Sequence, residues 1–442
     1  MKSPLPIFLI LVSMSWNPVR AAARSQAPPE VPQAAANAPA AMTLEQALAR
    51  VFERNPEMTV SELEIKAASA RVLQAGRRPN PEFLAETENL STFGGAGLLQ
   101  YAESTLQVSQ RMELGGKRAL RVSAAEREVA VAAGQLAVTK VELLAAASQA
   151  FVHVLTEQER AANQKELSRL ARETHAIVVE RVAAGKAAPI EQTRAGVALT
   201  TALLEEQKRR QLLVAAKDRL ATLWGGSHQD IDAVQAVFAI PPVSLEPAAS
   251  CLVNHPALKL AAAAVDSQNA VLALELAARK PDLTFSAGFR RLSTEQKNVL
   301  VAGISILLPV FDKRAGAIAE ARIRLDQANS QQQAIELRLH AALAQARHEY
   351  EVAVLESKTL AEEALPAARE AAAAVDEGYR LGKFDFLNVI DAQRTLAELG
   401  TKAIDAVAAG LKAAIEIQRL SRCDAPTDPA VSGGAERTRY EP

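Results

Sequence analysis

Apolar and small side chains recur at alternating three- and four-residue steps in the second half of the chain. The series runs through Leu325, Ala328, Gln332, Ile335, Leu339, Ala342 and Ala346. This spacing is typical of the a/d seam of a coiled coil and differs from the two-residue alternation of a strand. It predicts a long helix over about 314–381, which Pro366 is expected to kink, and a second helix over about 383–419. Unbroken, the first of these would be about 100 Å long.

Shorter segments in both halves of the chain follow the pattern of strands. Between about 101 and 114, Leu106, Val108 and Met112 alternate with polar residues. This predicts a strand with one apolar and one wet face. Comparable segments lie at about 82–91, 281–292 and 298–311, so each half is expected to contribute one strand hairpin.

The two halves repeat the same order of landmarks. Proline-containing breaks, strand pairs, Lys-Arg dipeptides and Gly-Lys turns recur at offsets between 196 and 202 residues. This predicts a tandem duplication, with a first repeat at 42–226, a connector at 227–247 and a second repeat at 248–421. The long helices of the first repeat are expected at about 118–184 and 187–223.

The two ends of the chain carry a different composition. Lys2 and the apolar run Leu5–Val12 precede small residues near Ala23, the arrangement of a signal peptide over 1–23. The apolar run is too short to span a bilayer as a helix. Residues 24–41, rich in proline and alanine, predict a disordered linker, and 422–442 a flexible tail. The chain is therefore expected to be exported.

Composition and motifs argue against several classes of function. The formal net charge of −1 gives no basic field for nucleic acid. The two cysteines and six histidines show no zinc spacing, and no nucleophile elbow or phosphate loop occurs. We therefore expect a protein that is not an enzyme and that has no cofactor and no metal site of its own.

Strands of this length with one apolar face suit a membrane barrel, but four strands cannot close one. Open sheet edges are not tolerated in lipid. Closure would require several subunits to share one barrel, and a conducting lumen favours twelve strands, hence a homotrimer.

With these features the chain resembles the TolC-type outer-membrane efflux proteins. The resemblance rests on the duplication, on Glu113-Leu114-Gly115-Gly116-Lys117-Arg118, and on the segment Gly378–Gln393. It implies a mainly helical fold with a small β part, in which long-helix hairpins form an α-barrel below a twelve-stranded β-barrel. It also implies an outer-membrane location in a Gram-negative bacterium, contact with outer-membrane lipid, a periplasmic adaptor (membrane fusion protein) and an inner-membrane RND pump. The Leu-Gly-Gly-Lys-Arg passage is similar to the branch that exports heavy-metal cations.

The resemblance also implies roles for residues near the two helical turns. Gly185, Lys186, Gly382 and Lys383 would meet the adaptor. Asp391 and Asn388 occupy positions where the family places acidic residues around a periplasmic gate, and Glu191 and Arg194 are their counterparts in the first repeat. Because Asn388 replaces a carboxylate by an amide, the gate departs from the family pattern here. Cys251 and Cys423 would lie near each other in the periplasmic belt, where a disulfide can form.

Two other functions are compatible with parts of the pattern. A duct of the same architecture could export drugs or other small molecules, since no Met- or His-rich tract marks a metal path. A periplasmic coiled-coil scaffold or adaptor would explain the helices but not the duplicated strand hairpins.

Overall fold

The computed structural model describes residues 41–90, 101–243 and 252–421. Its α-helices are α1 (Leu44–Arg54), α2 (Pro56–Ala75), α3 (Lys117–Ala183), α4 (Pro189–Ala221), α6 (Pro256–Ala278), α7 (Ala315–Thr359), α8 (Leu365–Arg380) and α9 (Phe386–Ser421). Its strands are β1 (Glu82–Glu88), β2 (Glu103–Met112), β3 (Leu283–Leu292) and β4 (Lys297–Ile306). The expected fold class, mainly α with a small β part, is confirmed.

Local caps set where the first helices begin. Thr43 and Gln46 form the reciprocal capping box of α1, with bonds of 3.1 and 3.3 Å. Asn55 caps α2 through Glu57 N–H at 2.8 Å, ahead of Pro56. Its side-chain amide also donates to the Leu223 carbonyl at 2.9 Å, which attaches the start of α2 to the end of α4.

The four strands form one antiparallel sheet in the order β1-β2-β3-β4. Its register places apolar residues opposite each other on one face, such as Leu106 opposite Phe289 and Phe289 opposite Leu300. Phe289 and Leu300 are 66% and 72% exposed, so this face is not covered within the chain. The opposite face carries Thr105, Gln107 and other polar residues, as predicted.

All four strands are shorter than the sequence pattern suggested, and β2 and β3 begin at Glu103 and Leu283, two residues later than expected. The predicted strand at 298–311 ends at Ile306, because its partner β3 begins at Leu283 and because Pro309 lacks the N–H that a ladder needs. The predicted strand at 82–91 ends at Glu88, and Asn89 follows with a positive φ of 55°.

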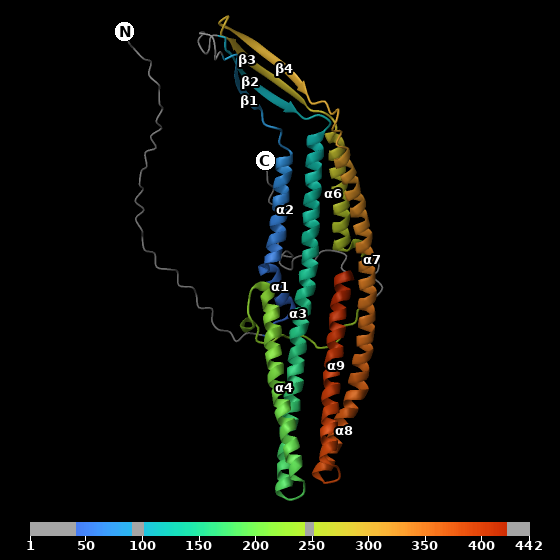
Figure 1. Cartoon of the computed structure of the whole chain (residues 1–442). Coiled ribbons are helices and arrows are strands. Elements are labelled where there is room, and N and C mark those ends of the chain that lie inside the picture. The colour runs from blue at the N-terminus through green and yellow to red at the C-terminus, as the bar shows by residue number, and fades with distance from the viewer. Residues whose placement is uncertain (1–40, 91–100, 244–251, 422–442) are drawn as a thin grey trace, which may run out of the picture. The chain divides into compact units, whose positions relative to one another are not determined.

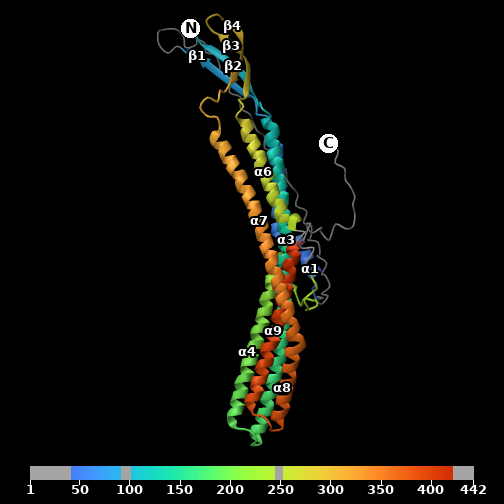
Figure 2. The ribbon, with the colours of Figure 1, turned by 90° about the vertical axis from the view of Figure 1, so that its right-hand side faces the viewer.

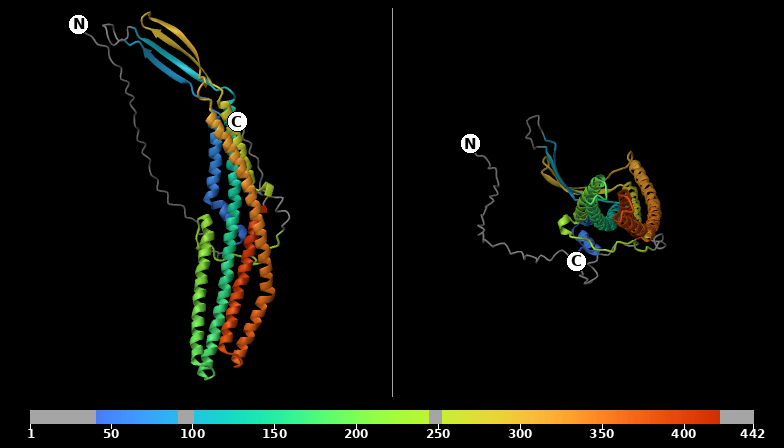
Figure 3. Two further views of the ribbon diagram at one scale, coloured as in Figure 1. Left: turned by 45° about the vertical axis from the view of Figure 1, so that its right-hand side comes forward. Right: turned by 90° about the horizontal axis from the view of Figure 1, so that it is seen from below.

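The helices pack side by side in two successive groups (Figures 1 and 3). Next to the sheet, α2, α3, α6 and α7 are neighbours; toward the two turns, α4, α3, α9 and α8 are neighbours. The helix α3 takes part in both groups, and α7 also packs on α9 before α8 continues toward the tip. The predicted seam of α7 is confirmed, because Leu339 and Ala346 are buried in a cluster with Ile417 of α9.

The predicted continuous helix over 314–381 is interrupted. A five-residue π-helix, Leu360–Ala364, separates α7 from α8. Pro366 is the second residue of α8 and cannot donate the hydrogen bond that a continuous α-helix requires at that position. A π-bulge is a common irregularity at such a break in the helical ladder.

A second hydrophobic cluster, besides the one at Leu339, Ala346 and Ile417, lies where the connector between the repeats runs across the helices. Phe151 and Val154 of α3 pack there with Leu220 and Trp224 from the end of the first hairpin. Gln158 holds the crossing segment through both backbone groups of Val234, at 2.8 and 3.0 Å. The expected signal peptide, most of the linker, the tail and the Cys251–Cys423 pairing lie outside the described residues.

Candidate functional site at the helical tip

Both hairpins reverse through the same backbone motif. Gly185 follows α3 with φ of +68°, and Gly382 follows α8 with φ of +76°. In the first turn, Lys186 N–H bonds the Arg181 carbonyl at 2.8 Å; in the second, Lys383 N–H bonds the Gly378 carbonyl at 2.8 Å. These are Schellman caps, in which glycine accepts the left-handed conformation without the strain of a Cβ.

The two turns lie at the same end of the molecule, where the hairpins pack against each other (Figure 2). Val178 of α3 and Ala195 of α4 form one buried cluster with Tyr379, Phe386 and Val389 from the second hairpin. This cluster joins the repeats close to their tips.

Polar contacts join the same tips. The Tyr379 hydroxyl donates to the Glu191 carboxylate at 2.9 Å. The Arg181 guanidinium lies 4.3 Å from the centroid of the Tyr379 ring and donates to the Tyr379 carbonyl. One turn farther from the tip, Gln393 donates to the Thr174 hydroxyl at 2.7 Å.

Tyr379 is held in its neutral form by its surroundings. Burial raises the pKa of its hydroxyl to about 12, and the hydrogen bond to Glu191 acts in the same direction. The hydroxyl therefore remains a donor across the physiological range.

The predicted gate residues divide into two groups. Glu191 takes part in the contact between hairpins, whereas Asp391, Asn388 and Arg194 are exposed. Asp391 pairs with Arg394 one turn along its own helix, and both side chains are 67% exposed. In a single subunit the structure therefore does not bring Asp391 to Glu191. The docking candidates Gly185, Lys186, Gly382 and Lys383 are all exposed.

Sequence reasoning missed Arg181 and Tyr379 as the partners of this contact. Tyr379 was noted only as part of a motif. One signal could have found it: the chain has four tyrosines, and this one stands three residues before a turn glycine.

A second link between the hairpins lies farther from the tip. Arg160 of α3 bonds Glu157 on its own helix and Asp405 on α9, the latter from Nε at 3.1 Å. The Glu157 side chain is only 4% exposed. Its other cationic neighbour, Arg209, is 3.9 Å away. Arg160 therefore neutralises a buried charge and fixes α9 to α3.

The described residues contain no group of three or more His, Cys, Asp or Glu arranged to hold a metal ion. What the tip can do physically is keep two helical hairpins together through one tyrosine, one carboxylate and one guanidinium.

Comparison with known proteins agrees with this geometry. The model of the family described as "Outer membrane efflux protein" matches residues 47–226 and 249–421, one match for each repeat. The cobalt-zinc-cadmium resistance protein CzcC of Cupriavidus metallidurans is 32% identical over 386 residues, covering 86% of this chain and 90% of that protein. The nickel-cobalt-cadmium resistance protein NccC of Alcaligenes xylosoxydans xylosoxydans is 26% identical over 70% of each chain.

A solved structure has the same fold. The outer-membrane channel OprN superposes with a TM-score of 0.74, over 86% of this chain and 89% of that one, at 18% identity. At this identity the likeness concerns the fold alone.

Proposed function

Because this chain belongs to the outer membrane efflux protein family, we propose that it is the outer-membrane duct of a tripartite RND-type system that exports heavy-metal cations. The observation that carries the choice of cargo is the 32% identity, over nearly the full length of both chains, to a cobalt-zinc-cadmium resistance protein. The duct would be passive, with the driving energy supplied by an inner-membrane pump.

Open edges in the single subunit support a homotrimer. In the described residues β1 and β4 each pair on one side only, and the neighbouring helix group ends at α2 and α7. Those outer helices carry exposed apolar side chains, including Leu73 on α2 and Leu337 on α7. Joining β4 to β1 and α7 to α2 of the next subunit would cover both edges and close a barrel.

The helical tip is the proposed gate and docking end. The Tyr379–Glu191 bond would hold the hairpins in a closed arrangement, and three copies of Asp391 would surround the narrowed lumen. Like charges brought close together attract cations. The exposed turns at Gly185-Lys186 and Gly382-Lys383 would contact the periplasmic adaptor.

The test is deletion of this gene in its host, followed by growth in cobalt, zinc, cadmium, nickel and copper salts and in a panel of drugs. We expect loss of resistance to one or more divalent metals, with drug tolerance unchanged. Complementation by the full chain should restore resistance. Because Asp391 pairs only with a neighbour on its own helix, Asp391→Asn is a fold-preserving variant for testing the proposed cation ring in the same assay.

Each alternative has a distinct result. Drug sensitivity without metal sensitivity would assign the duct to a multidrug system. Release of the protein with the soluble periplasm, rather than with heat-modifiable outer-membrane trimers, would contradict the duct and favour a scaffold.

A further inference from the structure

Basic residues stand in pairs at every passage between a helix and a strand. The four pairs are Arg77-Arg78 before β1, Lys117-Arg118 after β2, Arg279-Lys280 before β3, and Lys313-Arg314 after β4. We call these eight residues the junction pairs. They occur at the same places in both repeats. The charge therefore lies at the boundary between the helices and the sheet in all four connecting segments, and not in one loop.

The connecting segments carry an excess of positive charge that the strands lack. The four connecting segments (77–81, 113–118, 279–282 and 307–314) contain eight basic and three acidic residues. The four strands contain four basic and four acidic residues. A closed trimer would therefore have a ring of excess positive charge at the helical end of its barrel.

Most of the eight junction residues have no counter-charge among the residues that the structure describes. Lys117 binds Asp282 at 2.7 Å, and Arg314 binds Glu275 at 2.7 Å. The other six side chains are exposed and have no acidic partner among the residues that the structure describes. Structural ion pairing thus accounts for only two of the eight cations.

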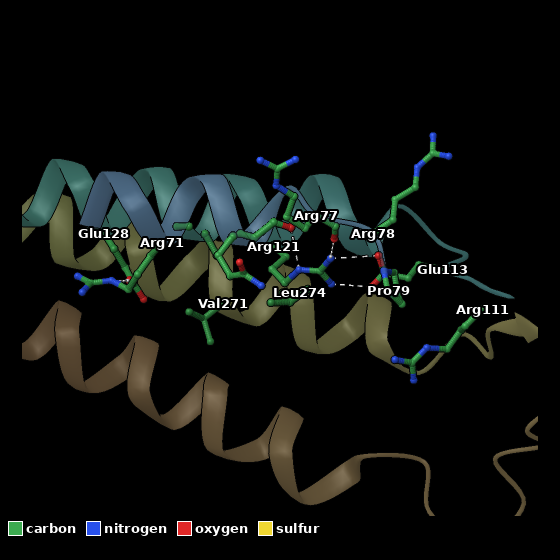
Figure 4. Close-up of a pocket in the computed structure, with 14 residues that line it drawn as sticks. Arg71, Arg77, Arg78, Pro79, Arg111, Glu113, Arg121, Glu128, Val271 and Leu274 are labelled. Carbon is green, nitrogen blue, oxygen red and sulfur yellow. Dashed lines mark hydrogen bonds and ion pairs between the residues drawn. The ribbon is translucent and has the colours of Figure 1, made fainter. Parts of the chain in front are cut away.

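Arg77 and Arg78 line one pocket with Arg111 but extend in a different direction. Figure 4 shows their side chains directed away from that of Arg111, which the register places on the polar face. In the same view Arg121 is occupied by Glu113, at 2.6 and 3.0 Å. Arg77 and Arg78 are exposed and remain available to a ligand.

A surface groove of about 460 Å³ gathers two of these cations next to the apolar face. Its lining includes the free cations Arg78 and Arg118, and also Gln110, Arg111, Met112, Glu113 and Lys117. By register, Gln110 and Met112 lie on the apolar face of the sheet, opposite Phe285 and Leu283. The groove therefore lies where a lipid-facing surface changes into a charged one.

The surface also changes from apolar to positively charged after β4. Leu307, Leu308, Val310 and Phe311 are all strongly exposed, with Phe311 fully so, and Lys313 follows directly. Exposed apolar residues followed by an exposed cation fit an interface in which acyl chains meet headgroups.

We propose that the junction pairs bind the phosphate groups of anionic phospholipids in the periplasmic leaflet of the outer membrane, with Arg78 and Arg118 of the groove forming one headgroup site per subunit and Arg77, beside Arg78, adding to its positive charge. Guanidinium groups match phosphate oxygens in charge and geometry. The lipid chains would lie along the apolar face above the site. This inference rests on the outer-membrane location of the family and is independent of the exported cargo.

The test is native mass spectrometry of the intact detergent-solubilised trimer, titrated with phosphatidylglycerol and, separately, with neutral phosphatidylcholine. We expect a clear preference for phosphatidylglycerol. The triple variant Arg77→Gln/Arg78→Gln/Arg118→Gln should lose about tenfold or more of this preference. The matched control Lys66→Gln/Arg322→Gln/Lys402→Gln removes the same charge from exposed helical positions elsewhere and should retain it.

Three results would overturn the proposal: an unchanged preference in the triple variant, an equal loss in the control, or displacement of the lipid by inorganic phosphate alone. The last would indicate a site for a free anion. If the triple variant does not form heat-modifiable trimers, Arg78→Gln and Arg118→Gln are measured singly, and the absence of any loss in both would refute the site. If deletion of the gene does not change metal resistance in the host, the proposed cargo is contradicted but this lipid-binding test is not affected.

Discussion

The Tyr379 hydroxyl donates a hydrogen bond of 2.9 Å to the Glu191 carboxylate, across 188 residues of sequence. This bond joins the last turn of α8 to the first turn of α4. It is a contact between repeats at the end of the molecule where both hairpins reverse. A change in the distance between the two tips must break it.

Tyr379→Phe should loosen the tips while preserving the buried ring contact with Phe386. Losing one hydrogen bond costs about 1 kcal/mol, because Glu191 is partly exposed and water can replace the partner. We expect higher single-channel conductance in planar bilayers. Tyr350→Phe is the control, since it removes a tyrosine hydroxyl away from the tip, with its bonds to the Pro241 carbonyl and the Val243 N–H. Equal conductance in wild type and the Tyr379 variant would contradict a gating role.

Stability at alkaline pH should depend on the same residue. The pKa of Tyr379 is raised to about 12 in the folded chain, against about 10 in the unfolded one. Its contribution is therefore complete below pH of about 10 and is lost as pH rises toward 12. Unfolding followed by circular dichroism should show a smaller alkaline loss in Tyr379→Phe. A loss of stability at alkaline pH identical to that of wild type would show that Tyr379 is not its source.

His255 should make the protein sensitive to acid. Its buried Nδ1 accepts the Ala257 N–H at 3.2 Å as the cap of α6. Burial, followed by the charge of Arg419, lowers the pKa of His255. Because this pKa is lower in the folded chain than the value of about 6.5 in the unfolded chain, neutral His255 contributes its full stabilisation above pH of about 6.5. The contribution declines as the pH falls below that value.

The duplication supplies the variant that tests this. Asn55 caps α2 at the equivalent place, so His255→Asn should preserve the cap and reduce the acid-side loss of thermal stability. Burial also lowers the pKa of His153, so part of the pH dependence should remain. A pH dependence unchanged by the substitution would exclude His255 as its source.

Arg160→Ala should destabilise the link between α3 and α9 strongly. It leaves the Glu157 carboxylate, 4% exposed, without its main counter-charge, at a cost of about 3 kcal/mol. Asp405→Ala removes the exposed end of the same link and should cost less than about 1 kcal/mol. Denaturant unfolding in detergent measures both. Equal effects would mean that burial of Glu157 is not the cause.

Gly382→Ala should strain the second turn. At φ of +76° a Cβ has space, with Arg181 Nη2 as its nearest neighbour at 3.8 Å, so the cost is backbone strain of about 1–2 kcal/mol. Gly316→Ala is the control, because its Cβ meets no atom within 4 Å and the residue lies in α7 with ordinary helical geometry. It should stabilise by up to about 1 kcal/mol. Thermal unfolding that shifts in the same direction for both would contradict this account.

The sequence by itself determined the features that arise from local rules. The duplication, the two-faced strands and the turns at Gly185 and Gly382 all depend on periodicity or on the conformational range of single residues. Such features require no knowledge of which distant segment lies alongside. For this reason the fold class and the family resemblance were both within reach of the sequence.

Only the tertiary structure decided which helix meets which, and at what rotation. Tyr379 with Glu191, and Arg160 with Asp405, are 188 and 245 residues apart. A helical repeat tells which residues share a face, but not the stagger between two helices, so neither partner could be assigned. The end of β4 at Ile306 likewise depends on where its partner strand begins. Long-range partners are set by packing, which the sequence pattern constrains without specifying.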